Sequence, residues 1–293
     1  MKAMVQPALY PPPRPQSIGE VLDAGFRLFR ATLGHCLPYG ALVMIAGELG
    51  NLYELFSGRL PSATLELEHD RTWWTWYGVG LAIMLLLWGA LLTRQDALAR
   101  RRPVSMTAEL GASLRKFPQL VALTLIAWGG ITLGLLLLVV PGLYLAVALA
   151  FGAPALFVGG ASGPVRALAE SLRLVRGEWR RTALLMVLVI LITLAVDGVL
   201  SAVLTAASAV IADVDVADRM RVASISEIVG VIVGSITAPF WSAMILAIYA
   251  DLVRRAELRR PMDAGTPDSS GKGAAAGPDE RPRIGSDASA GNR

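Results

Sequence analysis

The sequence predicts an all-α, polytopic membrane protein with six transmembrane helices and three amphipathic helices at the cytoplasmic interface. Three observations lead to this fold class: six long apolar runs, an uneven distribution of Lys and Arg between them, and the overall composition. Hydrophobic residues make up 54% of the 293 residues and charged residues only 17%. Because soluble domains carry about 25% charged residues, this composition indicates a chain that lies largely in lipid.

The apolar runs are each long enough to cross a bilayer. A hydrocarbon core of about 30 Å needs about 20 helical residues at ~1.5 Å per residue. The six runs are 33–56, 74–93, 119–140, 142–160, 182–208 and 223–250. Between the third and fourth runs, Pro141-Gly142 predicts a tight turn, whereas longer outer loops are expected over 57–73 and 209–222. The first outer loop leads into an aromatic belt that begins at Trp73.

Lys and Arg residues lie almost entirely on one side of the predicted spans. Of the 27 basic residues, 23 precede the first run, follow the sixth, or lie between the second and third or the fourth and fifth. The other side carries only Arg59, Arg71, Arg219 and Arg221, beside seven acidic residues. Since basic residues are retained in the cytoplasm, the sequence predicts a multi-pass protein of the bacterial inner (plasma) membrane with both termini cytoplasmic.

The chain divides into three predicted segments. Residues 1–16 form a Pro-rich N-terminal tail that lacks the apolar stretch of a cleavable signal peptide. Residues 17–260 form the six-helix membrane domain, which begins with a capping box of Ser17 and Glu20. Residues 261–293 contain no aromatic residue and are rich in Gly, Ser, Ala, Asp and Pro, so we expect a disordered cytoplasmic tail.

Basic amphipathic segments precede the first, third and fifth apolar runs. Each has two apolar residues four positions apart followed by a basic residue, as in Leu168, Leu172 and Arg173. Such helices lie in the membrane interface, where Lys and Arg attract anionic lipids. The residues expected to bind lipid headgroups are Arg27, Arg30, Arg115, Lys116, Arg173, Arg176, Arg180 and Arg181. The similarity of the three segments fits either a threefold internal repeat or the pattern common to interfacial helices.

Two carboxylates lie inside apolar runs, Glu48 in the first and Asp197 in the fifth. An ionised side chain at a helix centre costs about 2.5–3.5 kcal/mol on insertion. These residues either form a proton or cation site or accept hydrogen bonds inside the bundle, and the structural role is favoured. Small residues four positions apart, such as Gly230 and Gly234, let helices pack closely within one chain or between copies in a homo-oligomer.

The sequence lacks the patterns of an enzyme or of a nucleic-acid-binding protein. It has no phosphate-binding loop, dinucleotide fingerprint or zinc-ligand spacing. The single cysteine, Cys36, excludes an intramolecular disulfide, and His35 and His69 fall on opposite sides of the predicted membrane. We therefore expect no catalytic residue, no cofactor and no metal site. The pI of about 9.5 reflects basic residues at the ends of the spans, which favours anionic lipid over nucleic acid as a partner.

Three stretches of the chain resemble a known family. The first runs from Ser17-Ile18-Gly19-Glu20 to Phe26-Arg27-Leu28-Phe29-Arg30. The second holds Pro141-Gly142-Leu143-Tyr144, Ala153-Pro154 and Ser171-Leu172-Arg173-Leu174-Val175-Arg176-Gly177, and the third runs from Ala238-Pro239-Phe240 to Tyr249-Ala250-Asp251-Leu252. Together they resemble the membrane domain of bacterial glycerophosphoryl diester phosphodiesterases and related free-standing six-helix inner-membrane proteins of unassigned function. The resemblance implies a helical membrane bundle without catalytic residues of its own.

These observations lead to one favoured function and two alternatives. The favoured function is a non-enzymatic membrane scaffold that interacts with anionic lipids or binds a partner protein. The first alternative is a small transporter or channel that uses Asp197 and Glu48. The second is the membrane subunit of a phosphodiesterase whose catalytic domain is on another chain.

Overall fold

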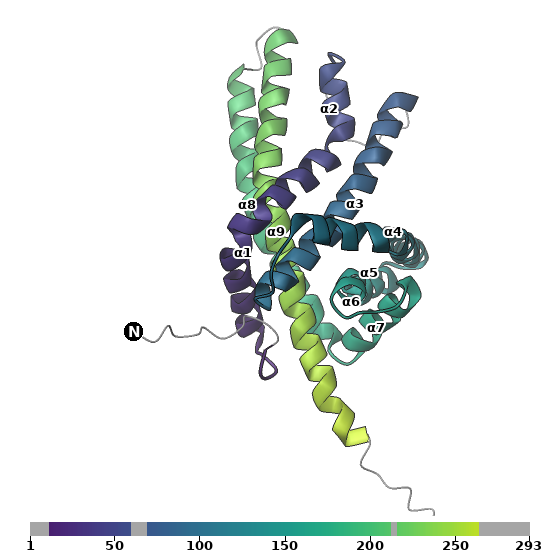
Figure 1. The fold of residues 1–293 in the computed structure, drawn as a ribbon. Coiled ribbons are helices and arrows are strands. Elements are labelled where there is room, and N and C mark those ends of the chain that lie inside the picture. Colours follow the sequence, from purple (N-terminus) through teal and green to yellow (C-terminus); the bar gives the residue numbers. More distant parts are fainter. Residues whose placement is uncertain (1–11, 60–68, 212–215, 264–293) are drawn as a thin grey trace, which may run out of the picture. The chain divides into compact units, whose positions relative to one another are not determined.

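The structure is a computed structural model that describes residues 12–59, 69–211 and 216–263 (Figure 1). Its helices are α1 (Ile18–Gly47), α2 (Leu49–Phe56), α3 (Arg71–Ala99), α4 (Met106–Leu137), α5 (Val139–Leu149), α6 (Gly152–Phe157), α7 (Pro164–Arg176), α8 (Trp179–Ile211) and α9 (Val216–Asp263). Within these ranges, six segments are long and apolar enough to cross a membrane, namely α1, α3, α4, α5 with α6, α8 and α9. The predicted fold class, an all-α protein with six such helices, is confirmed.

The predicted tails fall mostly outside the described residues. This holds for residues 1–11 of the N-terminal tail and for residues 264–293 of the C-terminal tail, as well as for 60–68 of the first outer loop. The described residues up to Leu258 belong to one compact unit.

The start of α1 has the predicted capping box. The Ser17 hydroxyl accepts a hydrogen bond from the Glu20 backbone N–H at 3.3 Å, and Glu20 Oε2 accepts one from the Ser17 N–H at 2.7 Å. These bonds satisfy two backbone donors that a helix N-terminus leaves unpaired, so they fix where α1 begins.

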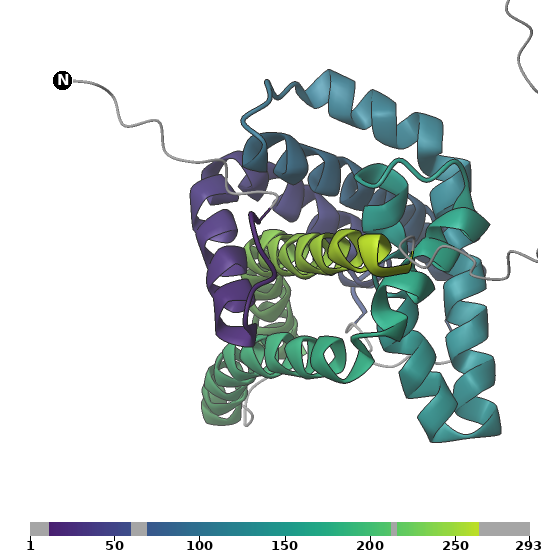
Figure 2. The ribbon, with the colours of Figure 1, turned by 90° about the horizontal axis from the view of Figure 1, so that it is seen from below.

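The three predicted amphipathic segments differ in how they join the apolar helices. The third is a separate helix, α7, which starts at Pro164 and ends before Gly177. The second is the beginning of α4, a helix that contains Pro118 and changes direction along its length in Figure 2. The first is continuous with the apolar part of α1, because no proline or glycine lies between Arg30 and Leu33 to end the helix. Two of the three segments are therefore the first turns of longer helices.

Two breaks differ from the predicted positions. The first apolar run is divided at Glu48, which separates α1 from α2. The turn between α4 and α5 is made by Leu138, whose backbone is extended (φ −162°, ψ 142°), and Pro141 lies in the first turn of α5. The prediction of a turn at Pro141-Gly142 is wrong. Proline is compatible with the first turn of a helix, because the backbone N–H that it lacks would have no partner within the helix there.

Helix α9 lies at the centre of the compact unit. Its side chains Met244, Ile248 and Tyr249 are almost completely buried against Phe151 of the α5–α6 junction and against the start of α8. Helix α1 packs against α9 at Gly40, where an added Cβ would collide with the backbone carbonyl of Ser235. Backbone contact of this kind is the usual use of small residues between membrane helices.

The α4–α5 hairpin runs crosswise to α8 and α9. In Figure 1, α8 and α9 rise through the view while α5 is seen nearly along its axis, and in Figure 2 the hairpin is seen from the side while α8 and α9 are foreshortened. The hairpin is closed by a close approach of Gly134 to Gly142. Leu136 and Val140 near its tip are among the most exposed apolar residues, as expected for surface that faces lipid.

Candidate functional site

A cleft in the described part of the chain lies among α1, α3, α8 and α9. Its volume is about 600 Å³. Its walls consist of Val43, Met44, Glu48, Met84, Leu85, Trp88, Asp197, Gly230, Val233, Gly234, Thr237, Ala238 and Trp241. Small-molecule sites usually measure about 300–1,000 Å³, so this cleft has the size of a ligand site.

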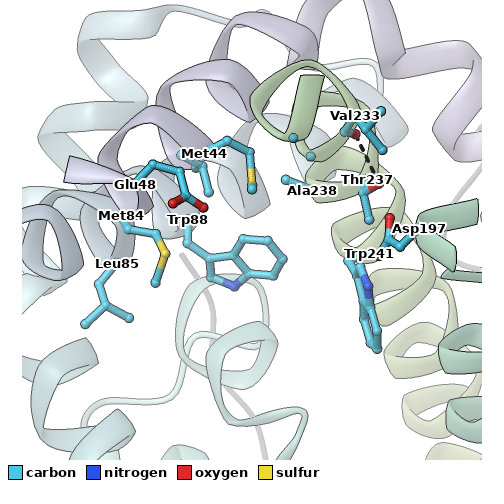
Figure 3. Close-up of a pocket in the computed structure, with 13 residues that line it drawn as sticks. Met44, Glu48, Met84, Leu85, Trp88, Asp197, Val233, Thr237, Ala238 and Trp241 are labelled. Atoms are coloured by element: carbon cyan, nitrogen blue, oxygen red, sulfur yellow. Dashed lines mark hydrogen bonds between the residues drawn. The ribbon is translucent and has the colours of Figure 1, made fainter. Parts of the chain in front are cut away.

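Both intramembrane carboxylates identified in the sequence line this cleft. Glu48 lies on the side of α1 and α3, and Asp197 lies on the side of α8 and α9 (Figure 3). Among the described residues that line the cleft, two are acidic and none is Lys or Arg. The structure therefore brings together two carboxylates that are separated by about half of the chain.

The two carboxylates differ in their hydrogen bonding. Glu48 Oε2 accepts a bond from Asn51 Nδ2 at 2.7 Å. Asp197 accepts no hydrogen bond from a described residue. The Thr237 hydroxyl, which lines the same cleft, donates instead to the Val233 carbonyl at 3.1 Å. The Asp197 carboxylate is half-buried. The expected hydrogen bonds that would hold it inside the bundle are not made by any described residue.

Aromatic and sulfur-containing side chains form much of the remaining wall. Trp88 lies near Glu48, and Trp241 lies near Asp197 and Thr237 (Figure 3). Met44 and Met84 contribute flexible, polarisable side chains. Indole faces attract cations, and methionine adapts to ligands of irregular shape.

The eight predicted lipid-binding residues fall into two groups. The exposed group is Arg27, Arg30, Arg115, Arg173, Arg176 and Arg180. In the other group, Lys116 donates to the Leu156 carbonyl at 2.6 Å, and Arg181 forms an ion pair with Asp251 at 2.6 Å. The heads of these two residues are bound to the protein, whereas the exposed six have no ion pair or hydrogen bond to another described residue.

Arg173 and Arg176 border a second cavity on α7. This cavity has a volume of about 410 Å³ and is also lined by Tyr144, Ala169 and Leu172. The Tyr144 ring stacks on Trp179 with centroids 5.6 Å apart, which fixes the aromatic side of the cavity. Two exposed guanidinium groups beside an aromatic wall are suited to an anionic headgroup.

A buried ionic network ties residues 13–16 to α8 and α9. The pairing of Asp251 with Arg255, four positions later, is expected from helical spacing, whereas the contacts with Arg181 and Gln16 are not. Asp251 is fully buried, and it accepts hydrogen bonds from Gln16 N at 2.7 Å, from Arg181 and from Arg255 Nε at 2.8 Å. Arg181 and Arg255 also donate to the Gln16 carbonyl, at 2.6 and 2.7 Å. Arg254 donates to the Pro13 carbonyl. The network attaches residues 13–16 to the helix bundle.

A second buried cluster joins α1, α3 and α4. Glu109 Oε2 accepts hydrogen bonds from Tyr39 and from Arg94 Nη1, both at 2.9 Å, and the Arg94 guanidinium lies 5.3 Å from the centre of the Tyr39 ring. The neighbouring Gln95 donates to the Pro239 carbonyl of α9 at 2.9 Å. Arg94 and Gln95 directly follow the second predicted span and Glu109 lies between the second and third, whereas Tyr39 lies inside the first.

Two residues of the predicted outer aromatic belt, Trp73 and Tyr77, form a stack with His69. The His69 and Trp73 ring centres lie 3.9 Å apart, Trp73 and Tyr77 lie 5.0 Å apart, and His69 Nδ1 is 2.9 Å from Glu54 Oε1. The Asp70 carboxylate caps α3 by accepting a hydrogen bond from the Trp73 backbone N–H. This bond is the main reason why the pKa of Asp70 is lower than the usual value for an aspartate. Within the described ranges, no group of three His, Cys, Asp or Glu residues is arranged to hold a metal ion.

Comparison with known proteins gives two matches. Residues 77–218 match the model of a family described as Uncharacterised protein family (UPF0259). A UPF0259 membrane protein of Sodalis glossinidius (strain morsitans) is 35% identical over 92 residues, which cover 31% of this chain and 36% of that relative. No solved structure matches. Neither match concerns a phosphodiesterase, and together with the six apolar helices they show a membrane protein similar to an uncharacterised membrane family.

Proposed function

We propose that this protein is a non-enzymatic scaffold of the bacterial inner membrane that holds anionic lipid headgroups at its basic surface. The observation that carries the proposal is the cavity on α7, where Arg173 and Arg176 stand beside Tyr144 with no protein partner in the described chain. Helix α7 buries Leu168, Leu174 and other apolar residues and exposes its arginines, as an interfacial helix does. The resemblance to the phosphodiesterase membrane domain supports this proposal only in so far as it implies a helical membrane bundle without catalytic residues of its own.

The proposal places both termini in the cytoplasm, and cysteine labelling tests this orientation. The native Cys36 is buried and gives little background. We expect Ser57→Cys to react with a membrane-impermeant maleimide in spheroplasts, and Arg102→Cys to react only after the membrane is broken. Both positions are exposed, so access to the reagent decides the result. The reverse labelling pattern would overturn the orientation.

Lipid binding is tested by neutralising the exposed arginines around α7. In nanodiscs, we expect the combined change Arg173→Gln, Arg176→Gln and Arg180→Gln to lower binding of phosphatidylglycerol at least tenfold. A basic group near an anionic surface contributes about 1 kcal/mol, and about 1.4 kcal/mol is tenfold in affinity. The control is Arg71→Gln, an exposed arginine of the predicted outer side, which should leave binding unchanged. Equal binding by the triple variant and the control would remove the scaffold proposal.

A second candidate function is binding or translocation of a solute through the intramembrane cleft. One specific observation favours it, since Glu48 and Asp197 line the same cleft although the sequence places them in the first and fifth predicted spans. Carboxylates inside membrane domains commonly mark solute or ion pathways.

A further inference from the structure

We propose that the cleft among α1, α3, α8 and α9 binds an organic cation with an apolar body, with Asp197 and Glu48 as its counter-ions. The proposal deepens the second candidate function by naming the ligand class. It does not depend on lipid binding at α7, because the two sites share no lining residue.

The charge of the cleft selects for a cation. Two carboxylates line it, and none of the described lining residues is Lys or Arg. The half-buried Asp197 carboxylate lines the cleft and accepts no hydrogen bond from a described residue, so it is the first candidate counter-ion. Glu48 already accepts a hydrogen bond from the Asn51 amide, so we expect it to contribute less than Asp197 to binding of the cation.

The walls of the cleft select for an apolar body. Apart from the two carboxylates and Thr237, the lining side chains are hydrocarbon, thioether or indole, and two glycines complete the wall. Bare Ca²⁺ and Mg²⁺ need about six to eight oxygen ligands, which the described lining does not supply. A cation that carries hydrocarbon groups can instead pack against the Met44 and Met84 side chains while its charge lies near Trp88, Trp241 and the carboxylates.

Substitution of Gly230 by a larger residue should fill part of the cleft without changing its charge. Gly230 lines the cleft, and a Cβ added there would meet no atom within 4 Å. Leucine at this position can therefore occupy cleft space, and it suits a helix better than glycine does. The neighbouring Gly234 is unsuitable, because a Cβ there would collide with the Met44 side chain.

Equilibrium dialysis of the detergent-purified full chain with radiolabelled tetraphenylphosphonium tests the proposal. We expect saturable binding that Asp197→Asn weakens about tenfold or more and that Glu48→Gln weakens less, since removing one counter-ion of a cation in a poorly hydrated site costs at least about one decade of affinity. Gly230→Leu should abolish binding while keeping both carboxylates. Tetraphenylborate has the same shape and the opposite charge, and it should show no saturable binding.

Two controls make the outcome decisive. Asp23→Asn removes one negative charge from an exposed position on α1 outside the cleft and should bind like the unchanged protein. Size-exclusion chromatography verifies that each variant is folded. Absence of saturable binding in the unchanged protein, equal binding of tetraphenylborate, or full binding in both Asp197→Asn and Gly230→Leu would overturn the proposal.

Uptake of tetraphenylphosphonium into proteoliposomes separates binding from transport. Binding with uptake that Asp197→Asn abolishes supports both the cation site and the second candidate function. Binding without uptake supports the site and removes translocation. Anionic lipid binding at α7 should be the same in all cleft variants.

Discussion

Replacing Asp251 with alanine is expected to lower the free energy of unfolding by about 3–5 kcal/mol, because the change leaves buried charges without their partner. The Asp251 carboxylate is fully buried, and Arg181 and Arg255 both donate to its Oδ2. The side chains of these arginines are only 15% and 21% exposed, so water replaces little of the lost interaction. The Gln16 N–H also loses its acceptor, which should release the N-terminal segment from α8 and α9.

The measurement is thermal unfolding in detergent, combined with limited proteolysis near Gln16. The control is Glu257→Ala, which breaks the ion pair of Glu257 with Arg254. The Glu257 side chain is 53% exposed, and surface pairs contribute about 0–1 kcal/mol, so this variant should unfold close to the unchanged protein. Similar unfolding temperatures for Asp251→Ala and Glu257→Ala would contradict a structural role for the buried network.

The number of helices and their approximate positions follow from hydropathy, because one apolar span needs about 20 residues whatever it packs against. The capping box at Ser17 was predictable for a similar reason, since its donors and acceptors lie within one turn. The breaks at Glu48 and Leu138 were not, because neither residue has a strong intrinsic tendency to end a helix. The crosswise direction of the α4–α5 hairpin also follows from tertiary packing, which a hydropathy profile does not contain.

The residues of the candidate sites could also be predicted only in part from the sequence. Glu48 and Asp197 were recognisable one by one, because ionisable residues in apolar runs are rare. Their meeting in one cleft depends on the packing of α8 and α9 against α1 and α3. Arg180 and Arg181 look equivalent in the sequence, yet adjacent residues on a helix point in different directions. Only Arg181 reaches Asp251, 70 positions further along the chain.

Single substitutions of Arg94 or Glu109 should cost about as much as that of Asp251, again about 3–5 kcal/mol, whereas removing both should cost far less. The pair is buried, with side chains 15% and 5% exposed, and its nitrogen and oxygen atoms are 2.9 Å apart. Within the described ranges, Arg94→Met leaves the Glu109 carboxylate with the Tyr39 hydroxyl as its one side-chain donor. Glu109→Met leaves the Arg94 guanidinium buried without its anion.

A double-mutant cycle of Arg94→Met and Glu109→Met, followed by thermal unfolding in detergent, measures the coupling. Within the described residues, Arg94 Nε and Glu109 Oε1 are buried and lack a hydrogen-bond partner, so the ion pair does not fully offset the desolvation of its own charges. The double variant should therefore be more stable than either single variant. The control is Glu257→Ala, which breaks the exposed Arg254–Glu257 pair within one helix and should cost less than about 1 kcal/mol. Additive losses in the double variant would contradict the coupling and would assign the single-variant losses to side-chain packing.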